Sequence, residues 1–143
     1  MSGGPFDLDD ADAYGRWRDQ KRFRRPAGLG DLVVEVDDIA ALRPPEVAAL
    51  TARVGRANMA VYVERRPAAG RDDKAAVAAL GRAFGLSSLD RNHLADDDGI
   101  TPLAVAAEGA RARYIPYTER PIAWHTDGYY NPPATRVRGL VLH

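Results

Sequence analysis

The stretch Trp124-His125-Thr126-Asp127-Gly128-Tyr129-Tyr130-Asn131-Pro132-Pro133 places an imidazole and a carboxylate two residues apart beside a turn. On an extended segment successive side chains point to opposite faces, so His125 and Asp127 are expected to share one face. Gly128 allows a sharp turn after the carboxylate, and the Asn-Pro-Pro run that closes the stretch ends regular pairing. The pattern predicts two metal ligands where a strand opens into a loop.

The composition of the 143-residue chain, 45% hydrophobic and 28% charged, predicts one globular domain over residues 1–143. Its 20 basic and 20 acidic residues cancel, so we expect no nucleic-acid partner. The absence of cysteine excludes disulfides, thiolate zinc sites and iron-sulfur clusters, and it is typical of the cytoplasm. No run approaches the roughly 20 apolar residues of a membrane span, and the first residues lack a signal pattern, so we expect a cytoplasmic protein without membrane association.

Five elements are predicted before residue 86 from hydrophobic spacing and from turn and capping residues. They are a helix over Asp9–Arg25, a strand over Leu32–Val36, a helix from Pro44 to about Asn58, a strand over Met59–Glu64, and a helix that Asp72 caps and Gly85 ends. The first helix forms a helical N-terminal extension over residues 1–30. Its basic run, Arg16 to Arg25, follows an acidic start, which matches the helix dipole and indicates a solvated helix rather than a patch for an anionic partner. The strand over Met59–Glu64 is little interrupted by polar residues, which predicts burial on both faces.

The sequence from residue 86 onward predicts a polar loop and three strands. The loop contains Asp96-Asp97-Asp98-Gly99, but Leu94 and Val105 occupy positions where a helix-loop-helix calcium site needs oxygen ligands, so a solvated turn is expected. The strands are predicted at Pro102–Ala107, Arg113–Tyr117 and Arg136–His143. Because the chain stops inside the last, apolar strand, we expect a truncated chain.

The stretch Tyr114-Ile115-Pro116-Tyr117-Thr118-Glu119-Arg120-Pro121, with Trp124-His125-Thr126-Asp127 and Pro132-Pro133 after it, resembles the first metal motif of a known enzyme superfamily. These enzymes are the iron(II)- and 2-oxoglutarate-dependent dioxygenases related to taurine dioxygenase and 2,4-D dioxygenase. The resemblance extends over residues 31–143. It implies an α+β chain that forms the N-terminal part of a double-stranded β-helix, or jelly roll, with flanking helices, and it implies that this fold is incomplete here.

The resemblance also implies an activity, a cofactor and a set of site residues. Such enzymes hold iron(II) with two histidines and one carboxylate, and they couple oxidative decarboxylation of 2-oxoglutarate to hydroxylation of a small organic substrate. In this sequence the resemblance assigns the role of metal ligand to His125 and Asp127. Trp124, Tyr129 and Tyr130 are candidates for lining the substrate pocket. The second histidine and the arginine that binds 2-oxoglutarate are not identified, since His143 lies where the family places no ligand. The chain alone is therefore expected to be inactive or nearly so.

Three other interpretations remain open. In an arbitrary sequence, a histidine and an aspartate beside a turn form a hydrogen-bonded surface pair more often than a metal site. The chain could instead be a non-catalytic binding or assembly module, which pairs with another copy or a partner chain through the exposed edge of the strand over Arg136–His143. The ligand types also suit zinc in a hydrolytic site. His93, in a polar loop, is interpreted as a solvated histidine.

Overall fold

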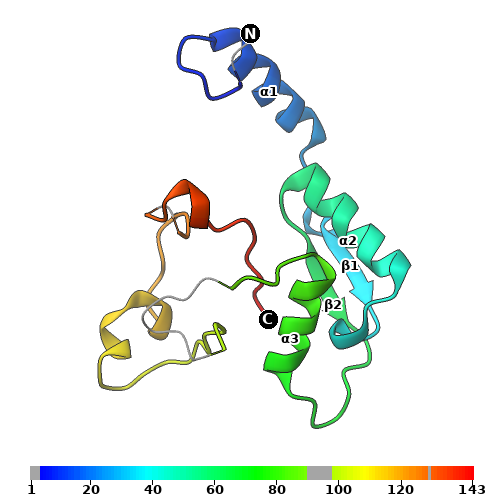
Figure 1. Cartoon of the computed structure of the whole chain (residues 1–143), viewed down its shortest axis with the longest axis vertical. Helices are drawn as coiled ribbons and strands as arrows, with labels where there is room; N and C mark the ends of the chain where they lie inside the picture. Colours follow the sequence, from blue (N-terminus) through cyan, green and yellow to red (C-terminus); the bar gives the residue numbers. More distant parts are fainter. Residues whose placement is uncertain (1–3, 90–97, 129) are drawn as a thin grey trace. The chain divides into compact units, whose positions relative to one another are not determined.

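The computed structural model describes residues 4–89, 98–128 and 130–143 (Figure 1). The chain divides into two compact units, Met1–Phe84 and Gly85–His143. The assignment of the whole chain to one domain stays a prediction.

The centre of the first unit is a β-α-β arrangement. Strands β1 (Val33–Val36) and β2 (Val61–Glu64) are parallel and pair from Val33 opposite Val61 to Val36 opposite Glu64. Helix α2 (Pro44–Ala57) connects them, as a parallel pair requires. Figure 1 shows the two strands side by side, with α2 beside them. Both predicted strands are thus confirmed, each slightly shorter than its apolar run.

Helix α2 begins and ends where its sequence signals predicted. Prolines occupy its first turn, where a missing N–H costs no helical hydrogen bond. The Glu46 carboxylate accepts hydrogen bonds from the backbone N–H of Arg43 at 2.7 Å and of Asp37 at 2.8 Å, so it caps α2 and holds the end of β1. Asn58 closes the helix in the left-handed conformation at φ 60°.

Helix α3 (Asp73–Ala83) completes the core of the first unit. The Asp72 side chain accepts hydrogen bonds from the backbone N–H groups of Lys74 and Ala75, as its capping role predicted. The helix packs against the short 3-10 helix η2 (Ile39–Ala41). The buried apolar side chains of this core are Val34, Val36, Ile39, Leu50, Ala76 and Leu80. Burial of the Met59–Glu64 strand on both faces was wrongly predicted, because Val63 of β2 is exposed and Met59, in the predicted run, lies outside the strand and is exposed as well.

Helix α1 (Ala11–Arg24) confirms the predicted N-terminal helix. Asp10 caps it by accepting a hydrogen bond from the N–H of Ala13, and Trp17 contacts the rings of both Phe6 and Tyr14. Within the unit, its last turn is joined to the end of α2, since Arg56 donates a hydrogen bond to the carbonyl of Arg24 at 3.0 Å. A short 3-10 helix, η1 (Leu29–Asp31), leads into β1.

The described part of the second unit contains three short 3-10 helices, η3 (Arg111–Arg113), η4 (Ile115–Tyr117) and η5 (Pro133–Thr135), and no strand. Its buried residue is Tyr117, whose carbonyl accepts a hydrogen bond from the N–H of Ala106 at 2.9 Å and whose ring lies beneath the Arg111 guanidinium. This small core holds the segment that precedes the candidate site.

The three strands predicted for this unit are therefore wrong. Residues 102–107 and 136–143 have no regular secondary structure. In the strand predicted over Arg113–Tyr117, Arg113 ends η3, Tyr114 separates the two 3-10 helices, and the remaining residues form η4. An apolar, β-branched run becomes a strand only when another strand satisfies its backbone groups, and the described part of this unit supplies none. Pro116 also lacks the N–H of a strand residue, while its fixed φ suits the first turn of a 3-10 helix.

The chain combines helices with a two-stranded parallel sheet. This sheet is too small to decide between folds, so the jelly roll stays a prediction. Among the described residues, no helix has the length and apolar character needed to cross a membrane.

Candidate metal site

The candidate site lies in a loop and not at a strand end. The segment enters the loop from η4, where Thr118 donates its hydroxyl to the carbonyl of Ile115 and accepts a hydrogen bond from the N–H of Arg120. Residues 121–127 have no regular secondary structure, and Gly128 then turns the chain at φ +64°. The predicted turn after Asp127 is confirmed. The strand predicted before it is absent, because the described part of this unit supplies no partner strand.

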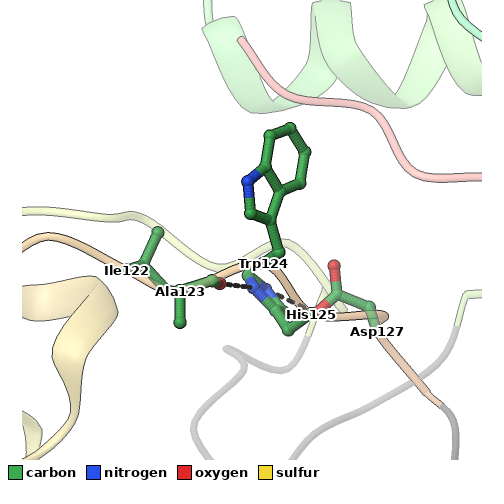
Figure 2. A pocket seen from close by; sticks show the side chains of 5 residues that line it. All are labelled: Ile122, Ala123, Trp124, His125 and Asp127. Atoms are coloured by element: carbon green, nitrogen blue, oxygen red, sulfur yellow. Dashed lines mark hydrogen bonds and ion pairs between the residues drawn. The ribbon is translucent and has the colours of Figure 1, made fainter.

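His125 and Asp127 bring a nitrogen and an oxygen together, as their spacing predicted. Nε2 of His125 lies 3.5 Å from Oδ1 of Asp127 (Figure 2). The two side chains are 50% and 55% exposed, so this pair is open to solvent and to ions. Both residues come from one short loop, and the pairing is therefore local.

A backbone carbonyl orients the imidazole. Nδ1 of His125 lies 2.8 Å from the carbonyl oxygen of Ala123, and a carbonyl can only accept, so Nδ1 must carry the hydrogen (Figure 2). In the neutral ring this leaves the lone pair on Nε2, the atom that faces Asp127. Metal-binding histidines commonly make this kind of hydrogen bond with the nitrogen that does not bind the ion.

The Nε2 lone pair of neutral His125 and the Asp127 carboxylate are two acceptors on the same side of the loop, and a divalent ion bound by both atoms would be attracted to each of them. If each donor lies about 2.1 Å from one ion, adjacent octahedral positions separate the donors by about 3.0 Å and tetrahedral positions by about 3.4 Å. The observed 3.5 Å requires the donors to close by about half an ångström for octahedral iron and by less for tetrahedral zinc.

The residues fit an iron(II) centre in part. Imidazole and carboxylate are two of the ligand types in a face of two histidines and one carboxylate. Among residues 4–89, 98–128 and 130–143, no group of three or more His, Asp or Glu residues is arranged to hold an ion. His143 belongs to no such group, its role as a ligand stays untested, and His93 lies outside the described residues.

Apolar side chains border the pair on one side. Ile122, Ala123 and Trp124 line an open hollow together with His125 and Asp127, and the Trp124 indole is fully exposed and projects from the chain (Figure 2). Tyr130 is exposed and is not among the residues that line this hollow. Tyr129 lies outside the described residues. Of the three aromatic residues predicted to line a substrate pocket, Trp124 is therefore the one that the structure places beside the pair.

Two contributors to the geometry of this loop could not be predicted from the sequence. The carbonyl of Ala123 orients His125, and a backbone carbonyl has no residue-type signature from which it could be recognised. Val137 contacts Gly128 across nine positions of the chain, and a contact at this separation also has no sequence signature. By contrast, Asn131 was assigned to the turn, and its side chain does donate to the carbonyl of Thr135 at 3.0 Å.

The candidate site therefore consists of an oriented imidazole, a facing carboxylate and an adjacent apolar wall within one loop. Comparison with protein-family models finds no match for this chain, and comparisons with curated proteins and with solved structures find none either.

Proposed function

We propose that this chain carries two protein ligands, His125 and Asp127, of the iron(II) centre of a 2-oxoglutarate-dependent dioxygenase. One observation supports the proposal above all: Nε2 of His125 faces Oδ1 of Asp127 while Nδ1 donates to a backbone carbonyl. This is the tautomer and the direction that a metal-binding histidine needs. The resemblance of the surrounding motif favours iron over the other divalent ions that the same donors accept.

Each residue has a distinct part in this proposal. His125 donates a nitrogen whose direction the Ala123 carbonyl maintains, and Asp127 contributes a negative charge that offsets the charge of the ion. Trp124 offers an apolar surface beside the ion for the carbon skeleton of a small organic substrate. Bound iron and 2-oxoglutarate would supply the oxidising chemistry. The proposal includes no nucleic-acid or membrane partner, and it retains the cytoplasmic location expected from the sequence.

Paramagnetic broadening by iron(II) tests the proposed ligands. Under anaerobic conditions, iron(II) alone is added to the labelled chain, and the imidazole signals of the three histidines are followed by NMR. We expect selective, saturable broadening of His125 that is lost in Asp127→Ala, with His93→Ala as the matched control that keeps it. Equal broadening of all three histidines, or none, would contradict the proposal. Zinc added in competition distinguishes the hydrolytic alternative, which predicts tighter binding of zinc than of iron together with hydrolytic activity.

An oxygen electrode tests the expected activity. A centre with two protein ligands binds iron weakly, so we expect the chain alone to consume no dioxygen above the background of free iron(II) when 2-oxoglutarate is present. Dioxygen consumption that requires both iron(II) and 2-oxoglutarate would disprove the expected inactivity. It would at the same time support the assignment of the reaction.

A second candidate function is a non-catalytic assembly module, which the exposure of Leu140 and Leu142 favours. In this alternative, residues 136–143 add as a strand to another copy or to a partner chain, and pairing would supply the partner strand that the described residues lack. Sedimentation velocity over a range of concentrations tests it. A dimer that Leu140→Lys dissociates supports the module, and a monomer at all concentrations counts against self-association.

A further inference from the structure

The turn that follows the proposed ligands is tightly packed. Gly128 has a φ of +64°, in the left-handed region that favours glycine, and its carbonyl accepts a hydrogen bond from the N–H of Asn131 at 3.0 Å. A Cβ built on Gly128 would overlap Cγ2 of Val137 and lie 3.1 Å from Cβ of Val137. The Val137 side chain therefore occupies the space that any other residue at position 128 would need.

This packing lies next to a proposed metal ligand in the chain. Asp127 and Gly128 share a peptide bond, so a movement of Gly128 away from Val137 rotates or shifts the Asp127 backbone. The second side of the turn is also fixed, because Asn131 donates its side-chain amide to the carbonyl of Thr135 at 3.0 Å in η5. Nδ2 of Asn131 would also lie 3.6 Å from a Cβ on Gly128, so this side chain borders the same space.

We infer that Gly128 and Val137 are positioning residues that hold the Asp127 carboxylate opposite Nε2 of His125. The inference rests on the proposed function, since it assigns the contact a purpose in metal binding. A binding site loses affinity when its donor atoms are displaced by about an ångström, so close packing beside a ligand preserves the geometry of the pair.

A set of four variants separates the steric contact from backbone strain. Gly128→Ala introduces both the strain of a positive φ and the overlap with Val137. Gly109→Ala is the matched control, because Gly109 has a φ of +85° in the same unit and nothing within 4 Å of the position of its Cβ. Val137→Ala enlarges the space, and the double variant Gly128→Ala/Val137→Ala removes Cγ2, the most severe overlap, while the 3.1 Å contact with Cβ remains.

Two NMR measurements are made on each variant. The first is the apparent Kd of iron(II) alone, from anaerobic broadening of the His125 imidazole. We expect Gly128→Ala to raise this Kd at least about tenfold, Gly109→Ala to leave it within about twofold, and the double variant to recover a large part of the loss. The second, without metal, is the nuclear Overhauser effect between the His125 ring and the Asp127 Cβ protons. We expect Gly128→Ala to weaken it and the double variant to restore it.

The outcomes distinguish the inference from the proposed function. If Gly128→Ala keeps both the wild-type Kd and the wild-type Overhauser effect, or if Gly109→Ala causes an equal loss, the inference is wrong and the proposed ligands stand. If wild type shows no selective broadening of His125, the proposed function fails, and the metal-free measurement alone decides whether the contact positions Asp127. A double variant that is no better than Gly128→Ala also overturns the steric argument.

Discussion

Nε2 of His125 lies 3.5 Å from Oδ1 of Asp127, and these two atoms define the candidate site. Because the carboxylate charge attracts a cation more strongly than an amide dipole does, Asp127→Asn should weaken iron(II) binding by at least about tenfold. Titration of iron(II) under anaerobic conditions, with broadening of the His125 ring as the signal, measures the change. The matched control is Asp98→Asn, because Asp98 lies in the same unit and accepts a hydrogen bond from the N–H of Ile100. Equal effects of the two substitutions would show that Asp127 contributes only general charge.

Arg71 should stabilise the first unit more than any exposed arginine of that unit. Its guanidinium pairs with both carboxylate oxygens of Glu64 and also contacts Asp38 and Asp73, and the side chains of Arg71 and Glu64 are only 10% and 9% exposed. Glu64 in turn accepts a hydrogen bond from the N–H of Ile39, so the network joins the end of β2 to η2 and to the start of α3. Removing the arginine leaves the Glu64 charge buried without its main partner.

We therefore expect Arg71→Met to lower the midpoint of thermal unfolding by on the order of 10 °C. Arg65→Met is the matched control, because Arg65 pairs with Glu35 and Asp37 at the surface. Exposed ion pairs contribute little, so this variant should change the midpoint by no more than a few degrees. Circular dichroism at 222 nm on heating measures both values. Similar midpoints for the two variants would disprove the structural importance of Arg71.

Glu46 should make the stability of the first unit depend on pH. The Arg43 side chain and the backbone N–H groups of Arg43 and Asp37 lower the pKa of Glu46 from its ordinary value of 4.5 to about 2. Because the pKa is lower in the folded chain than in the unfolded chain, the stabilisation is present above about pH 4.5 and is lost as the pH falls toward 2. Glu46→Gln cannot titrate, so its pH dependence in this window should be weaker.

Urea unfolding at pH 7 and at pH 3 measures this effect. We expect the midpoint of the wild-type chain to fall more between the two pH values than the midpoint of Glu46→Gln, and the variant to be less stable than wild type at pH 7. The expected difference follows only from the group at position 46, since the other carboxylates are common to both chains. Parallel pH profiles for the two chains would contradict the assignment.

Leu50 should be among the most sensitive positions of the core. It lies on the inner face of α2 and is 4% exposed, so Leu50→Ala should lower the free energy of unfolding by about 3 kcal/mol. Leu29 is 68% exposed, and Leu29→Ala should change it by less than about 0.5 kcal/mol. Chemical denaturation of both variants tests the pair. A loss of similar size at Leu29 would show that η1 is covered in solution.

The sequence by itself determined the first unit almost entirely. Asp72, the double proline before Glu46 and Asn58 mark helix ends through contacts with neighbouring residues, and such local signals were recognised in the sequence. The capping role of Asp10 was not predicted. The two strands were predictable because each is a short apolar run rich in β-branched residues, whereas their parallel pairing is seen only in the structure. The approach of His125 to Asp127 was also predictable, since it depends on a separation of two residues.

Only the tertiary structure decided the features that depend on distant partners. The runs at residues 102–107 and 136–143 have strand-forming residues but no strand, because a strand needs a second chain segment and no local pattern shows whether one is present. The exposure of Val63 likewise depends on what covers the second face of the sheet. The direction of the His125 ring and the contact of Val137 with Gly128 follow from a backbone carbonyl and from a residue nine positions away. The sequence thus identifies the two proposed ligands by residue type. The orientation of their side chains depends on how the loop packs around them.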